Sequence, residues 1–342
     1  MALSTLHRRA FRAVGLSAPS WAKPWQTRQT ATAGRRGPKI AVLGNCQARA
    51  IAQAMRLLAP ASAVDLVPFG RLKRDHGHID TLARALGAYD HVFAQQFTAD
   101  LIPGGDIHAL RAARPGIVLF PTIVFTAFHP DTLYVLGRPE RGRPHFAPSP
   151  MGLYHSALAL AAHRLGLTLP QAITLFREEV FAPLGYLDVW DAASRELLTS
   201  AAEIGFPLDR EILRWARAGS FMHIINHPKA MVVEDIARRL LAESGLAPEP
   251  VAVADYLGDE LIRDVVWPVY PEVAETFGFT GSYLFKNKPV GGAFPALFDL
   301  ESFLRASFAI YDAQPGDALH CARVDAWLAT PEIRALLEAA RA

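Results

Sequence analysis

The sequence predicts an α/β protein in which a small N-terminal parallel βαβ sheet unit is followed by a mainly helical region. Short apolar runs begin near residues 40, 64, 91 and 116, and intervals of about 25 residues suit parallel strands joined by helical crossovers. After Pro130 the apolar residues recur mostly at helical spacing. With 342 residues, 51% hydrophobic and 20% charged, and a mean hydropathy of +0.14, the chain has the composition of a folded globular protein.

The sheet unit is expected over residues 39–125. Its first strand is the apolar run 40–43, which ends at Gly44 and leads into a helix whose apolar residues follow the i, i+3, i+4, i+7 pattern. Further strands are predicted over 64–69, 91–97 and 116–124. Strand, turn and helix therefore follow one another from the start of the unit.

The remainder, residues 126–342, is predicted to be mainly helical. Apolar-periodic segments lie at 151–166, 170–184, 188–204, 209–219, 229–244, 299–312 and 330–342. Residues 137–150 and 286–296 are rich in Gly and Pro and are predicted to be loops. The expected organisation is one domain over 39–342, preceded by a flexible basic extension over 1–38.

Charge is unevenly distributed along the chain. Residues 1–39 hold eight Lys and Arg and no acid, which leaves 27 bases against 33 acids in the remainder. The acidic body argues against nucleic-acid binding, because neutralising phosphates needs a clustered positive face. The basic segment predicts a flexible extension, with an organellar targeting peptide as the alternative.

Cysteine content and hydropathy bear on location. Two cysteines cannot form a disulfide framework, which suits a reducing compartment. The most apolar run, residues 116–128, is shorter than a membrane span and contains Pro121. We expect a cytoplasmic protein, soluble or peripheral, with no transmembrane segment; the oligomeric state stays open.

Cys46 is the strongest candidate for a catalytic residue. Ligands bind at the carboxyl ends of parallel strands, and Gly44, Asn45, Cys46 and Gln47 follow the first strand directly. A thiol at a helix start meets unpaired N–H groups and the helix dipole, which should lower its pKa. Asn45 and Gln47 carry amides able to donate to an oxyanion. Cys321 has no comparable setting and is interpreted as structural.

A reactive thiol needs a base, and three histidines are candidates. His129 and His227 each precede a proline, which favours an extended, loop-held geometry, whereas His155 lies near a helix start. The residues alone do not choose among the three.

Other common motifs are missing from the sequence. His223 and His227 are four apart, but Pro228 disfavours a helix there and no glutamate follows His223, which argues against a zinc site. No metal is expected. The phosphate-loop signature is absent, and the Gly44 turn lacks the second and third glycines of a dinucleotide site.

Several short segments together resemble one family. The Gly44–Gln47 motif resembles that of the WcbI family of polysaccharide-biosynthesis proteins, regarded as acetyltransferases of bacterial capsule assembly. The likeness continues through Gln95-Gln96-Phe97, Phe128-His129-Pro130-Asp131, Tyr154-His155-Ser156, Asn226-His227-Pro228, Tyr270-Pro271 and residues 281–286. It spans about residues 39–312.

The resemblance implies binding of coenzyme A or acetyl-CoA, and acetyl transfer to the hydroxyl of a sugar or polysaccharide precursor. It makes Cys46 the catalytic cysteine. Either Cys46 carries the acetyl group, or a histidine activates the sugar for direct attack while Cys46 positions the thioester. The expected cofactor-binding residues are Gly44, Asn45, Gln47, Arg49, Gln96 and Lys286, with Lys288 as a further phosphate contact.

Two other classes of function remain open. A thiol or ester hydrolase on the same scaffold would use water as the acceptor and would not depend on coenzyme A. A non-catalytic component of a glycan assembly complex would bind coenzyme A or a nucleotide at the Cys46 turn without turnover. A nicotinamide-dependent oxidoreductase is disfavoured by the missing glycines.

Overall fold

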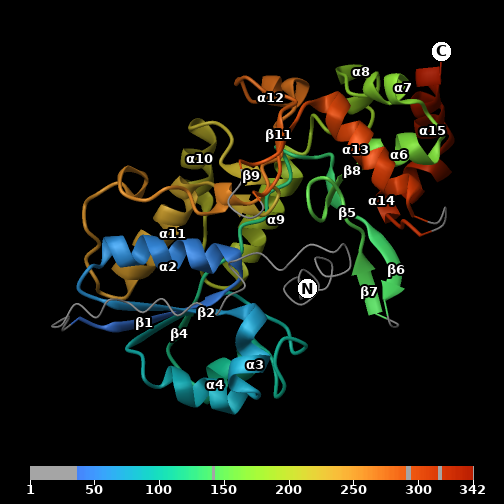
Figure 1. The fold of residues 1–342 in the computed structure, drawn as a ribbon. Coiled ribbons are helices and arrows are strands. Elements are labelled where there is room, and N and C mark those ends of the chain that lie inside the picture. The colour runs from blue at the N-terminus through green and yellow to red at the C-terminus, as the bar shows by residue number, and fades with distance from the viewer. Residues whose placement is uncertain (1–36, 141–142, 290–293, 315–317, 342) are drawn as a thin grey trace.

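The computed structural model describes residues 37–140, 143–289, 294–314 and 318–341. The extension expected over 1–38 therefore lies outside the described residues, apart from its last two. Within the described part, the predicted architecture is confirmed: a parallel sheet with helices at the N-terminal end, followed by a mainly helical remainder (Figure 1).

The sheet has four parallel strands in the order β2-β1-β3-β4. They are β1 (Lys39–Gly44), β2 (Ala63–Pro68), β3 (His91–Ala94) and β4 (Ile117–Leu119). The central strand β1 pairs with β2 on one side, Ile40 opposite Val64, and with β3 on the other, Ile40 opposite His91. Both neighbours are parallel, so the carboxyl ends of all four strands lie at one edge.

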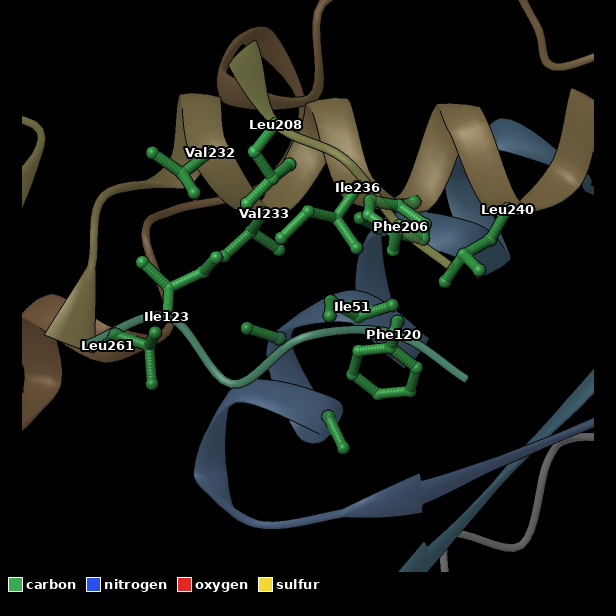
Figure 2. Packing of buried hydrophobic residues seen from close by; sticks show 14 of the residues in the cluster. Ile51, Phe120, Ile123, Phe206, Leu208, Val232, Val233, Ile236, Leu240 and Leu261 are labelled. Carbon is green, nitrogen blue, oxygen red and sulfur yellow. The ribbon is translucent and has the colours of Figure 1, made fainter. Parts of the chain in front are cut away.

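Alternate residues of β1 face opposite layers. Ile40 and Val42 join a core with α2 (Cys46–Leu58) and α11 (Ala230–Glu243), and Figure 2 shows Ile51 of α2 near Phe120, below residues of α11. Ala41 and Leu43 instead join a core on the opposite face of the sheet. The helices of that face are α3 (Leu72–His76), α4 (Ile79–Leu86) and α5 (Ile107–Ala113). Figure 1 shows α2 and α11 on one side of the strands, and α3 and α4 on the other.

Two further helices, α9 (Trp190–Glu203) and α10 (Asp209–Arg217), pack into the same core as α2 and α11. The other helices surround a further core at the C-terminal end. They are α6 (Ala157–Arg164), α7 (Leu169–Ile173), α8 (Glu178–Phe181), α12 (Pro271–Thr276), α13 (Leu300–Asp312), α14 (Ala322–Ala329) and α15 (Pro331–Glu338). Four antiparallel strand pairs lie between them: β5 (Thr132–Tyr134) with β8 (Tyr154–Ser156), β6 (Leu136–Glu140) with β7 (Arg143–Phe146), β9 (Met222–Ile224) with β10 (His227–Pro228), and β11 (Phe285–Lys286) with β12 (Leu297–Phe298).

Some boundaries differ from the sequence prediction. β4 ends at Leu119, before the end of the predicted strand 116–124, because Pro121 has no N–H to donate to a neighbouring strand. The amides that follow bond outside the sheet: Ile123 N donates to Gln47 Oε1, and Phe125 N donates to Ile225 O. The predicted loop 137–150 contains most of the β6–β7 hairpin, which tolerates its prolines because a two-stranded ribbon leaves half of its amides unpaired. Helices α12 and α14 were not predicted.

A buried carboxylate organises the second core. Asp131 is fully buried, and its Oδ1 accepts hydrogen bonds from Leu158 N at 3.0 Å and Tyr186 Oη at 2.8 Å. Its Oδ2 accepts from Tyr270 Oη at 2.8 Å. Since Leu158 lies in α6 and Tyr270 caps the start of α12, one side chain ties β5 to elements distant in the sequence.

Among the described residues, no helix combines the length and the apolar character that crossing a membrane requires.

Candidate active site

The turn that presents Cys46 is held by a short set of hydrogen bonds. β1 ends at Gly44, Asn45 caps the helix in an extended conformation, and Cys46 is the first residue of α2. The side chain of Asn45 accepts from Gln47 N, and Asn45 N donates to Gln95 Oε1, both at 2.9 Å. Gly44 is needed because a Cβ there would lie only 2.3 Å from Gln95 Oε1. The motif therefore fixes the position of the thiol tightly.

Gln47 anchors this turn to two distant parts of the chain. Its side chain is buried, and Nε2 donates to Ile123 O and to Asn226 O, both at 2.8 Å. Its Oε1 accepts from Ile123 N at 2.9 Å. A primary amide has two hydrogens, and both of those on Gln47 are used in these bonds. Gln47 therefore holds the turn in place and has no hydrogen left to donate to a ligand.

Cys46 is exposed to solvent, although the protein packed near its thiol removes part of the thiol's hydration. Loss of hydration raises its pKa to about 11; the charge of Asp264 adds to this, while the N–H of Gln47 and the charge of Arg49 oppose it. The expectation that the helix start would lower this pKa is therefore wrong, because desolvation outweighs the helix N–H groups. At neutral pH the free thiol carries its proton.

Of the three candidate histidines, His227 is the one that shares a charged neighbour with Cys46. Burial tends to raise the pKa of Asp264, but Lys288 first and then His227 hold it below its usual range. Asp264 in turn raises the pKa of the Cys46 thiol. His227 is buried at the bulge of the β9–β10 pair, directly after the Asn226 that Gln47 binds.

The other two histidines are built into the packing. His155 is fully buried, with Nδ1 3.1 Å from Tyr311 Oη and Nε2 3.1 Å from Ala147 O, and burial lowers its pKa to about 4. His129 is also buried, and burial, followed by the charge of Lys229, lowers its pKa to about 3. Both rings are therefore neutral near pH 7, in surroundings that favour the uncharged form.

The predicted cofactor contacts fall into two groups. Arg49 lies one turn into α2 and acts on the Cys46 thiol, and Gln96 is exposed just beyond β3. Lys286 instead donates through Nζ to Ile262 O at 2.6 Å and Asp264 O at 2.7 Å. Lys288 Nζ lies 2.7 Å from Asp264 Oδ2. The two lysines thus gather around Asp264.

Sequence reasoning gave no role to four polar residues at this site. Tyr154 and Asn226 were noted only as parts of segments that resemble the family, and Tyr134 and Asp264 were not singled out at all. Tyr134, Tyr154 and Asn226 form one hydrogen-bonded group. Asn226 carried a usable signal, since it interrupts the apolar run 221–225 immediately before His227. Asp264 lies in an irregular segment with no local pattern to mark it. Within the described ranges, no three His, Cys, Asp or Glu side chains come together as metal ligands.

Comparisons with known proteins agree on one family. The model of the family described as polysaccharide biosynthesis enzyme WcbI matches residues 39–249. A solved structure of WcbI, described as a native protein without a disulfide bond between coenzyme A and one of its cysteines, has a TM-score of 0.61 at 20% identity. The match covers 89% of this chain and 99% of that one. A search of curated proteins found no match.

Proposed function

Because the chain belongs to the WcbI family of polysaccharide biosynthesis enzymes, we propose that it transfers an acetyl group from acetyl-CoA to a sugar hydroxyl. The observation that carries this proposal is the hydrogen bond from Gln47, the residue after Cys46, to the main-chain oxygen of Asn226, the residue before His227. The charge of Asp264, which acts on both the Cys46 thiol and His227, is consistent with it. The setting we propose is the cytoplasmic assembly of a capsule or exopolysaccharide.

In this mechanism Cys46 is the nucleophile and His227 the base. A thiol whose pKa is about 11 cannot ionise unaided at neutral pH, so transfer of its proton to an imidazole is needed. The carboxylate of Asp264 stabilises the imidazolium that results. The thiolate attacks the thioester carbon, and the departing thiolate of coenzyme A takes the proton from His227.

The second half of the reaction reverses these roles. His227 accepts the proton of the sugar hydroxyl as its oxygen attacks the acetyl carbon, and the Cys46 sulfur leaves and regains a proton from His227. Direct transfer from acetyl-CoA to the sugar would use the same base without the acetyl-cysteine. The side-chain amide of Asn45, beside the thiol, is a proposed donor to the acyl oxygen.

Binding of coenzyme A is assigned to the surroundings of the Cys46 turn. We place its phosphates near Arg49, with Lys286 and Lys288 contributing positive charge from the β11–β12 side. Gly44 allows the tight turn beside the thiol, because a residue with a Cβ would meet Gln95 and Ala48. Gln96 is exposed at the neighbouring strand end. These residues are separated in sequence, and the proposal requires them to face one ligand at the carboxyl edge of the sheet.

The first test is calorimetric titration of the purified protein with coenzyme A. We expect binding in the micromolar range, lost or weakened in Cys46→Ala and unchanged in Cys321→Ala, whose cysteine is buried in the other core. Absence of heat and of any thermal shift at millimolar coenzyme A would refute the proposal, since a ligand of the native state must stabilise it.

Turnover then separates transfer from hydrolysis. With acetyl-CoA and a panel of sugar acceptors, an acetyltransferase releases coenzyme A in proportion to acetylated sugar. Release of free acetate at the same rate with and without a sugar would instead identify a thioesterase. His227→Gln should abolish either activity while leaving coenzyme A binding close to wild type.

A further inference from the structure

Two tyrosines and one asparagine form a polar group joined to the Cys46 turn. Tyr154 Oη donates to Asn226 Oδ1 at 2.9 Å, and Asn226 Nδ2 donates to Tyr134 Oη at 3.0 Å. The main-chain oxygen of the same Asn226 accepts from Gln47, the residue that follows Cys46. The two tyrosine rings lie 5.2 Å apart between centroids. The group is therefore fixed relative to the thiol through Gln47.

The direction of these hydrogen bonds leaves the hydroxyl proton of Tyr134 available for another acceptor. The Tyr154 hydroxyl donates its proton to Asn226, and the Asn226 amide donates a proton to Tyr134. The hydroxyl of Tyr134 thus acts as an acceptor toward Asn226, and a further hydrogen bond joins it to Tyr154. That bond lowers the pKa of Tyr134 and raises the pKa of Tyr154, so Tyr134 is the acceptor in it as well, and neither bond uses the proton of Tyr134. Tyr134 is half-buried, whereas Tyr154 is 4% exposed, so Tyr134 is the one of the pair that a ligand can reach.

We propose that the Tyr134 hydroxyl donates a hydrogen bond to the acyl oxygen when the thiol of Cys46 is acylated. This assignment rests on the proposed function, because it concerns the same thiol and the same thioester. Asn226 and Tyr154 are positioning residues, which orient the Tyr134 hydroxyl by occupying its acceptor side.

Two further observations fit a donor at this place. Burial, reinforced by the negative charge that a Cys46 thiolate would carry, raises the pKa of Tyr134 to about 12, so the hydroxyl holds its proton at neutral pH. Gln47 cannot donate to the acyl oxygen instead of Tyr134, because both hydrogens of its amide already donate to main-chain oxygens. A donor aimed at the developing oxyanion strengthens as charge accumulates there.

The test compares two reactions of the same thiol, neither of which needs coenzyme A or a sugar. p-Nitrophenyl acetate acylates the sulfur: the thiolate attacks the carbonyl carbon, the π pair moves onto the oxygen, and the C–O bond to p-nitrophenolate then breaks. Iodoacetamide alkylates the sulfur by displacing iodide, and no oxyanion forms at the reacting carbon. The ratio of the two rate constants thus isolates the donor from thiol pKa and access.

In Tyr134→Phe we expect acylation to slow by roughly 10- to 100-fold while alkylation stays within about twofold of wild type. The ring contacts of Tyr134 with Phe146 and Tyr154 need no hydroxyl, so the variant should fold, which its thermal midpoint checks. Tyr256→Phe, at a tyrosine that is 64% exposed, is the matched control and should leave both rates unchanged. Cys46→Ala gives the background.

An acylation-to-alkylation ratio in Tyr134→Phe equal to that of wild type would overturn the assignment. This result would leave the proposed function standing, because coenzyme A binding and acetyl transfer are measured separately. Conversely, a lowered ratio in a protein that binds no coenzyme A would confirm the donor while refuting the acetyltransferase.

Discussion

Cys46 combines features that pull its pKa in opposite directions. Its position at the start of α2 supplies N–H groups that favour a thiolate, and Arg49 adds positive charge. Desolvation and Asp264 oppose them and prevail, giving a pKa of about 11. The thiol is thus held in its protonated form until a base acts on it, which protects it from oxidation between turnovers.

The rate of Cys46 alkylation should reflect this pKa. Only roughly 1 thiol in 3,000 is ionised at pH 7.5 when the pKa is about 11, so the rate with iodoacetamide should rise about tenfold per pH unit through pH 9.5. Asp264→Asn should move the profile to lower pH, and Arg49→Gln should move it to higher pH. A plateau at or below pH 8 in the wild type, measured by intact mass against time, would contradict this.

Sequence reasoning located the thiol but not its protonation. Cys46 could be found because strand, turn and helix are local patterns, and their order places it at the sheet edge. Its pKa depends on Asp264, 218 residues further along the chain, and on how closely protein packs around it. Such long-range proximity cannot be recognised in the local sequence pattern. The prediction that the pKa of Cys46 is lowered was therefore wrong.

At the scale of elements, the junction of β1 and α2 is tightly constrained. Gly44 sits between the side chain of Gln95 in the neighbouring segment and Ala48 in the helix, and neither can move easily. The hydrogen bond from Asn45 N to Gln95 Oε1 holds the turn against the Gln95 side chain. The orientation of the strand relative to the helix is therefore fixed, and Cys46, at the start of the helix, is exposed.

Gly44→Ala should disturb this junction. Its Cβ would lie 2.3 Å from Gln95 Oε1 and 2.6 Å from Ala48 Cβ, so the Asn45–Gln95 bond must open or the helix must shift. We expect a loss of about 1–3 kcal/mol in the free energy of unfolding, measured by urea denaturation, and slower acylation of Cys46. Gly258→Ala is the control, since no atom of the described residues lies within 4 Å of its Cβ. Equal stabilities of the two variants would contradict the account.

Elements with strong periodicity were predicted well, and the others were not. α11 and α13 match the expected segments within one residue, since each presents an apolar face to a core. The β6–β7 hairpin was interpreted as a loop because its Pro- and Arg-rich sequence lacks alternation. Its strands form a separate two-stranded sheet, with one further bridge from Leu136 to His320, and do not belong to the parallel sheet. Packing in the parallel sheet therefore selects no hydrophobic pattern in them.

At the scale of the whole molecule, the second core depends on Asp131. Its carboxylate takes hydrogen bonds from two buried tyrosine hydroxyls and one backbone N–H, contributed by segments up to 139 residues apart. The motif containing Asp131 was noted from the sequence beside His129, but its role as a packing centre was not, because its partners lie far along the chain. A buried carboxylate with three donors is a structural group rather than a reactive one.

Asp131→Ala should lower the stability of the whole protein substantially. The hydroxyls of Tyr186 and Tyr270 and the N–H of Leu158 would remain buried without acceptors, at about 1–3 kcal/mol each. Differential scanning calorimetry should show a drop in Tm well beyond that of Asp312→Ala, whose carboxylate is 73% exposed in its pair with His163. Comparable losses in the two variants would exclude the central role of Asp131.

The bond from Gln47 to Asn226 spans 179 residues, and this separation sets an order of events during synthesis. At roughly 5–20 residues per second, the chain from Gln47 to Asn226 takes about 10 to 35 s to emerge from the ribosome. The β1–α2 turn can form early, but its thiol then lacks the neighbours that raise its pKa. The thiol of the unfinished chain is therefore expected to be more acidic than that of the finished fold.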